Sequence, residues 1–162
     1  MLCTGNAARS VMAGAMLSAR DTPARVTSAG THVVEHQPMS IRTREALAAV
    51  GLDAGNHRSR QLTEVDIDDA DLVVAMASEH VRFVRRRNPS GAGRTATITW
   101  LAKNLPPGPG PLRERVAALD LAGLDPDEQG DVADPAGGDD EDYARCAREL
   151  SVLVAELAPR LG

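Results

Sequence analysis

Short apolar runs alternate along the chain with longer segments of helical period. Strands are expected at 25–29, 70–76 and 95–100. Helices are expected at 10–20, 40–51, 77–87, 111–122 and 139–161. Strands that alternate with helices are typical of a mostly parallel sheet covered on both faces. We therefore predict an α/β fold, a three-layer sandwich with about four parallel strands, in which Met1 and Leu2 are all that is left of the first strand.

Breaks in the pattern mark the connections between these elements. Gly51 is placed to end the second helix, and Asn88-Pro89 stops the third. The segment 106–111 holds four prolines and two glycines, which favours a loop. No repeat or long linker divides the chain, so residues 1–162 are predicted to form a single domain.

The first dozen residues, M-L-C-T-G-N-A-A-R-S-V-M, hold the candidate chemistry. Cys3 and Arg9 bracket five mostly small residues, and Ser10 opens a helical segment. A loop of small residues before a helix directs backbone N–H groups to one point, which favours a dianion such as phosphate. The same dipoles and a nearby guanidinium would lower the pKa of the Cys3 thiol. One loop would then bind a phosphate and direct a sulfur nucleophile at it.

A plainer interpretation of the same residues is a buried structural cysteine beside a solvated arginine. The spacing of Cys3 and Arg9 alone does not separate the two interpretations. Gly5 and Asn6 favour the phosphate loop because both residue types tolerate positive φ, and Ser10 is suited to cap the following helix. The pair Asp134-Pro135, far downstream in the sequence, is a second candidate for a chemical role.

With these residues the chain resembles the low-molecular-weight protein tyrosine phosphatases. The matching segments are C-T-G-N-A-A-R-S at 3–10, T-S-A-G-T at 27–31, H-R-S-R-Q-L at 57–62, A-D-L-V-V-A-M at 70–76 and the Asp134-Pro135 pair. They occur in the family's order, at roughly its spacing, over nearly the whole chain. The resemblance implies a phosphatase that uses a cysteine and needs no metal or cofactor.

The resemblance also implies roles for the site residues. Cys3 would attack phosphorus, Arg9 would clamp two phosphate oxygens, and Asp134 would protonate the leaving group and then activate water. Nearby carboxylates are equally suited by chemistry alone, and the Asp-Pro pair selects Asp134. The remaining phosphate ligands would be backbone N–H groups of Thr4, Gly5, Asn6, Ala7, Ala8, Arg9 and Ser10.

A hydrogen-bond network under the loop is implied at Asn6, Ser10, Ser28 and His57. Asn6 in a left-handed conformation needs partners to offset strain, and His57 would supply one. A catalytic base or a metal ligand is the competing interpretation of His57. The four histidines show no metal-type spacing with cysteines or carboxylates, which disfavours a metal site.

The expected activity is hydrolysis of aryl phosphates through a cysteinyl-phosphate intermediate. The expected substrates are phosphotyrosine-containing proteins or small aryl phosphates, and oxyanions such as phosphate are expected to inhibit. Ala136 follows the Asp-Pro pair where the family commonly has an aromatic residue, which leaves tyrosine specificity open. A thiol-dependent arsenate reductase and a non-catalytic oxyanion-binding or regulatory domain are the alternatives.

Composition narrows the cellular context. The formal net charge of −5 argues against a nucleic-acid partner, and no apolar run is long enough for a membrane span. Two cysteines, one of them in the candidate anion loop, favour a reducing compartment, so we expect a cytoplasmic protein. Family members carry several apolar residues before the cysteine, so we also expect that this chain is shortened at its N-terminus.

Overall fold

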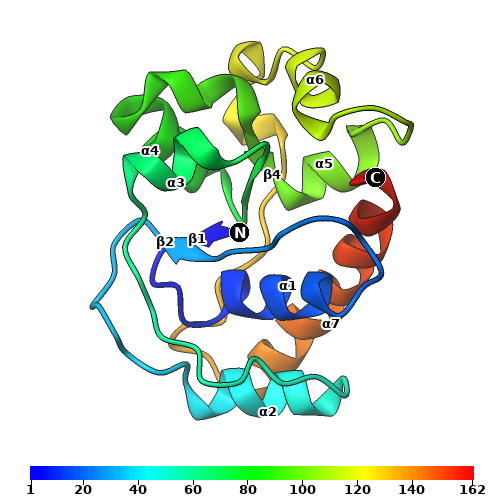
Figure 1. Ribbon diagram of the computed structural model, residues 1–162. Helices are drawn as coiled ribbons and strands as arrows, with labels where there is room; N and C mark the ends of the chain where they lie inside the picture. Colours follow the sequence, from blue (N-terminus) through cyan, green and yellow to red (C-terminus); the bar gives the residue numbers. More distant parts are fainter.

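The computed structural model describes residues 1–162, and its centre is a sheet of four short parallel strands (Figure 1). The strand order is β2-β1-β3-β4. The strands are β1 (Leu2–Cys3), β2 (Ala29–Gly30), β3 (Val73–Ala75) and β4 (Thr95–Thr97). The α/β class and the four-stranded parallel sheet predicted from the sequence are confirmed.

Strand β1 lies inside the sheet although it contains two residues. Leu2 pairs with Ala29 of β2 on one side and with Ala75 of β3 on the other. The strand predicted at 25–29 is shorter than expected, because β1 offers partners only to Ala29 and Gly30. All strands are parallel, so the loops that follow β1, β2 and β3 leave the same edge of the sheet.

Seven α-helices connect and cover the strands. They are α1 (Arg9–Ser18), α2 (Ile41–Ala49), α3 (Glu64–Asp69), α4 (Ser78–Arg87), α5 (Ile98–Asn104), α6 (Leu112–Ala117) and α7 (Asp140–Leu157). Short 3₁₀ helices occupy η1 (Pro89–Arg94), η2 (Leu121–Gly123), η3 (Pro126–Glu128) and η4 (Ala158–Arg160). In Figure 1, α3 and α4 lie above the sheet, and α1 and α2 lie below it.

Several sequence-based boundaries are wrong, and helix α5 was not expected. The strand expected at 95–100 ends at Thr97, whose hydroxyl accepts a hydrogen bond from the Trp100 N–H and so begins α5. The helix expected at 111–122 ends at Ala117. Helix α3 was not expected; a capping box between Thr63 and Asp66 stabilises its first turn.

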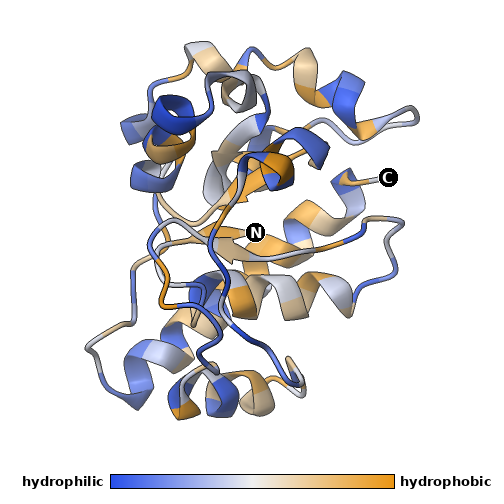
Figure 2. Cartoon of the chain, turned by 60° about the vertical axis from the view of Figure 1, so that its left-hand side comes forward, coloured by the Kyte–Doolittle hydropathy of each residue, from blue (hydrophilic) through white to orange (hydrophobic).

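Alternation along the strands divides the core between the two faces of the sheet. Leu2 and Val73 pack with residues of α3 and α4 in a small cluster. Cys3 and Val74 point to the opposite face and join the main core, to which α1, α5 and α7 contribute. Figure 2 shows the hydrophobic ribbon gathered at the strands and the hydrophilic ribbon on the outer helices.

Helix α7 carries the amphipathic pattern that the sequence predicted, and its Leu150, Val154 and Leu157 are buried. Tyr143 and Cys146 on the same helix are also buried in the main core. No helix of the structure combines the length and the apolar character needed to cross a membrane.

Candidate active site

The connection from β1 to α1 forms a loop with free backbone donors. Cys3 is the last residue of β1, and Arg9 is the first residue of α1. The backbone N–H groups from Gly5 to Ala8 donate to no other group of the protein. Ala8 provides no side-chain cap for α1. Free N–H groups at the start of a helix form a site for an anion.

Cys3 is buried at the base of this loop, with 3% of its surface exposed. Its Sγ lies 3.0 Å from Ser10 Oγ. Ser10 Oγ accepts a hydrogen bond from Asn6 Nδ2 at 3.0 Å, so its own proton is free to point at the sulfur.

Asn6 holds the loop in a strained conformation, with φ of 50°. Its Nδ2 donates to Ser10 Oγ and Ser28 Oγ, each at 3.0 Å. Its carbonyl oxygen lies 2.8 Å from His57 Nε2, and its Oδ1 accepts from the Arg60 N–H. The structure therefore brings together Asn6, Ser10, Ser28 and His57, and it adds Arg60 to the set.

Arg9 connects this loop with the segment before α7. Its Nη2 donates to Asp134 Oδ2 at 2.5 Å and to Thr4 Oγ1 at 3.4 Å, while Nη1 donates to the Val132 carbonyl oxygen at 3.2 Å. The Arg9 side chain is 4% exposed, and that of Asp134 is 43% exposed. Asp134 can thus reach solvent and a ligand, whereas the guanidinium is held inside the site.

Hydrogen bonds to the sheet fix the segment that carries Asp134. The Val132 N–H donates to the Met76 carbonyl oxygen at the end of β3. Asp131 Oδ1 accepts from the Ser78 N–H at 2.7 Å, where α4 begins. Asp134 Oδ1 accepts from the Ala136 N–H at 3.1 Å. The acid therefore has a defined position relative to the loop of Cys3.

The sequence did not indicate four further residues that contact the phosphate loop. Thr43 Oγ1 donates to the Ala7 carbonyl oxygen at 2.9 Å, and Arg60 contacts Asn6. Glu79 and His80 both lie beside Thr4. Their position directly after β3 was the available signal, because ligand sites of parallel sheets form at the carboxyl ends of neighbouring strands.

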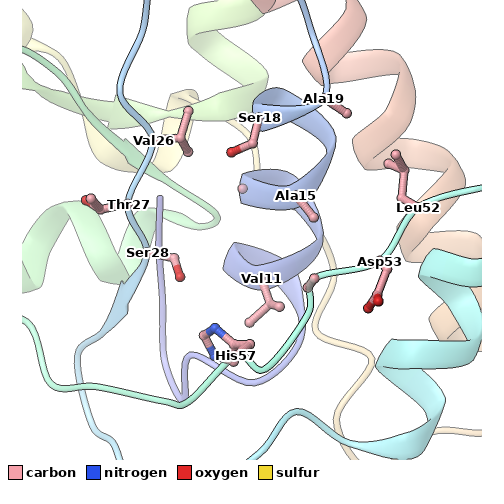
Figure 3. Close-up of a pocket in the computed structure, with 12 residues that line it drawn as sticks. Val11, Ala15, Ser18, Ala19, Val26, Thr27, Ser28, Leu52, Asp53 and His57 are labelled. Atoms are coloured by element: carbon pink, nitrogen blue, oxygen red, sulfur yellow. The ribbon is translucent and has the colours of Figure 1, made fainter.

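A cavity of about 480 Å³ lies behind the loop, between α1 and the segments 26–28 and 52–57. Figure 3 shows that Ser28 and His57, which support Asn6, also line this cavity. Cys3, Arg9 and Asp134 are not part of its lining. The cavity is therefore separate from the position where an anion would meet the sulfur.

Cys146 differs from Cys3 in its surroundings. It lies on α7 in the main core, and neither cysteine takes part in a disulfide. Burial raises the pKa of the Cys146 thiol to about 12. This thiol is therefore protonated at neutral pH and is a poor nucleophile.

Comparisons with known proteins agree with this geometry. Residues 1–105 match the family described as low molecular weight phosphotyrosine protein phosphatase. The chain is 34% identical over 161 residues to the protein-arginine-phosphatase of Geobacillus stearothermophilus, covering 99% of this chain and 93% of that protein. It is 32% identical over 110 residues to the low molecular weight protein-tyrosine-phosphatase Etp of Escherichia coli K12, covering 67% of this chain and 74% of that protein.

A solved structure extends the agreement to the fold. The low molecular weight protein tyrosine phosphatase from T. tengcongensis superposes with a TM-score of 0.75 at 33% identity, covering 96% of this chain and 93% of that one. The family match spans the phosphate loop, the segment around His57 and the first helix after β3. The chain therefore belongs to the low molecular weight phosphotyrosine protein phosphatase family.

Proposed function

We propose that this protein hydrolyses phosphorylated protein side chains, phosphotyrosine first among them, through a cysteinyl-phosphate intermediate. The proposal rests on one observation: three groups lie together at one loop. Cys3 lies at its base, the N–H groups of residues 5–8 in the same loop are free, and Arg9 contacts Asp134. Nucleophile, anion cradle and proton donor are the parts that phosphoryl transfer to sulfur needs.

In the first step, Cys3 Sγ attacks phosphorus, so an S–P bond forms as the P–O bond to the phenol breaks. Arg9 and the loop N–H groups hold the phosphoryl oxygens and stabilise the charge spread over them. Asp134, in its protonated form, gives its proton to the leaving phenolate oxygen. The products of this step are the free phenol and a phosphorylated cysteine.

In the second step, water attacks the phosphorus of the phosphocysteine. The Asp134 carboxylate takes a proton from that water, and the S–P bond breaks to regenerate the thiolate. Inorganic phosphate leaves from the same cradle. Phosphate and other oxyanions should therefore inhibit the enzyme in competition with substrate.

Phosphoarginine is a second candidate substrate, and two observations favour it. Two relatives, each matched over 99% of this chain, are named protein-arginine-phosphatases. Ala136 follows the Asp134-Pro135 pair, so this position offers no ring to stack on a tyrosine. The same two steps would then break a P–N bond, with the Asp134 proton going to the guanidine nitrogen.

One experiment separates these substrates. Peptides of a single sequence carrying phosphotyrosine, phosphoarginine or phosphoserine are compared by kcat/KM from phosphate release. A preference for phosphotyrosine of tenfold or more supports the first candidate, and the reverse preference supports the second. Phosphate binding without turnover of any peptide would contradict both candidates and favour a non-catalytic oxyanion-binding domain.

We also propose a cytoplasmic location. A reducing compartment keeps a thiol nucleophile reduced, and both Cys3 and Cys146 are free. In that location the enzyme would act on phosphorylated proteins of the cytoplasm. Fractionation of cells that express the tagged full chain tests it.

A further inference from the structure

His80, the third residue of α4, is a buried titratable group with no part in the two chemical steps. It is 1% exposed. Its Nε2 lies 3.0 Å from Thr4 Oγ1 and 3.2 Å from Glu79 Oε1. Its Nδ1 is buried without a partner. The only polar groups in contact with the His80 ring are therefore the hydroxyl of Thr4, which follows the nucleophile, and the carboxylate of Glu79.

The surrounding groups determine which ring nitrogen of His80 carries the proton. Glu79 Oε1 lies 3.2 Å from Nε2 and accepts a hydrogen bond from the Thr4 hydroxyl at 3.2 Å. We assign the proton to Nε2, because a carboxylate beside this nitrogen requires a donor. Nδ1 then keeps a lone pair, and an unpaired acceptor in the interior costs less than an unpaired N–H.

This assignment fixes the direction of the Thr4 hydroxyl. Thr4 donates its proton to Glu79, so its oxygen lone pairs accept from His80 Nε2 and from Arg9 Nη2, the latter at 3.4 Å. The opposite side of the guanidinium is held by the Val132 carbonyl oxygen. Asp134 makes the third contact of the guanidinium. When a phosphoryl group takes the place of Asp134, Thr4 and Val132 are the contacts left to hold the plane of Arg9.

Charge is consistent with this arrangement. Burial, followed by the nearby Arg9 cation, lowers the pKa of His80 to about 4. Glu79, Asp134 and Asp131 oppose this shift, but they are the smaller influences. A neutral ring can pack close to the guanidinium without repelling it.

We propose that His80 is a positioning residue for the phosphoryl-transfer reaction, holding the Arg9 clamp in its plane through the hydroxyl of Thr4. The inference rests on the proposed function, because that function assigns Arg9 the role of clamping the phosphoryl oxygens. A tilted guanidinium would lose one of its two contacts to the phosphoryl oxygens, and those contacts strengthen in the transition state. The loss should therefore fall mainly on kcat.

Three variants of α4 test the inference with 4-nitrophenyl phosphate as substrate. H80L removes the donor, and kcat/KM should fall about tenfold, the effect of one lost hydrogen bond. H80Q places an amide nitrogen where Nε2 lies, and its activity should stay within about threefold of wild type. V84A removes packing one turn further along the same helix, where Val84 is fully buried. It should lower the melting temperature by roughly 5 °C and leave kcat/KM unchanged.

A double-mutant cycle with T4V tests whether the effect of His80 on Arg9 passes through Thr4. If His80 acts through Thr4, H80L combined with T4V loses no more activity than the stronger single variant. Additive losses, H80Q as impaired as H80L, or V84A with the same kinetic defect would each overturn the inference. If the wild-type protein hydrolyses neither an aryl phosphate nor a phosphoarginine peptide, the proposed function fails. Calorimetric binding of inorganic phosphate, which uses the same Arg9 contacts in their weaker ground-state form, then decides: binding weakened at least about twofold by H80L supports the inference, and unchanged binding overturns it.

Discussion

Arg9 and Asp134, 125 residues apart in the chain, meet in the site with Nη2 2.5 Å from Oδ2. The arginine proposed to clamp phosphate thus also holds the carboxyl proposed to act as the acid. A phosphoryl group that enters the loop competes with Asp134 for the same N–H donors. Substrate binding would therefore release the acid at the moment when the leaving group arrives.

Replacement of Cys3 tests the nucleophile. C3S should lower kcat by at least about 1,000-fold, because a serine hydroxyl at this position is a far weaker nucleophile than a thiolate. Binding of inorganic phosphate, followed by calorimetry, should persist because the loop N–H groups are retained. C146S is the matched control and should keep activity within about threefold, since Cys146 is buried in the core.

The leaving group reveals the role of Asp134. D134N should lower kcat/KM about 100-fold for phenyl phosphate, whose phenolate needs a proton to leave. The loss should be much smaller for an activated ester with a nitrated phenol. D140N, which changes an exposed carboxylate at the start of α7, is the control. An equal loss for both esters would rule out proton donation by this residue.

Gly30 allows β2 to approach the phosphate loop. A Cβ at this position would lie 2.5 Å from the Thr4 carbonyl oxygen and 2.9 Å from the Asn6 nitrogen, and it would also strike Val33. G30A should therefore destabilise the protein by about 1–3 kcal/mol and weaken phosphate binding. G93A, where a Cβ meets nothing within 4 Å, should change neither property. Urea unfolding and phosphate titration of both variants provide the comparison.

His80 makes stability depend on pH. Its pKa is about 4 in the folded protein, against an ordinary value of 6.5. Below pH 6.5 His80 is protonated in the unfolded chain but stays neutral in the folded protein. The free energy of unfolding therefore falls as the pH falls toward 4. Between pH 7 and 4.5 the contribution lost is about 2–3 kcal/mol. Urea unfolding should show a smaller decline for H80Q than for wild type, and parallel declines would contradict this assignment.

Most of the fold could be predicted because the pattern of apolar positions reports which faces are buried. The expectations for α1, α2 and α4 agree with the structure to within two residues at every end. Helix α3 escaped prediction because its six residues bury only Ile67 and its start depends on the capping box. The end of β4 at Thr97 likewise depends on a single side-chain hydrogen bond.

Part of the candidate site could likewise be predicted from the sequence, and part could not. The loop around Cys3 is contiguous in sequence, so its residue types and spacing were informative. The contacts of Thr4 with Glu79 and His80 join residues more than 70 positions apart, and only the sheet order brings them together. Their types are common on helices, so nothing in the local sequence distinguished them from ordinary helix residues.

Trapping the covalent intermediate tests the mechanism most directly. The wild-type protein is mixed with 4-nitrophenyl phosphate, quenched within its first turnovers and digested for mass spectrometry. We expect one phosphoryl group on the peptide that contains Cys3, absent from C3S and retained in C146S. Turnover of the substrate with no phosphoryl group on Cys3, or with the group on another residue, would contradict it.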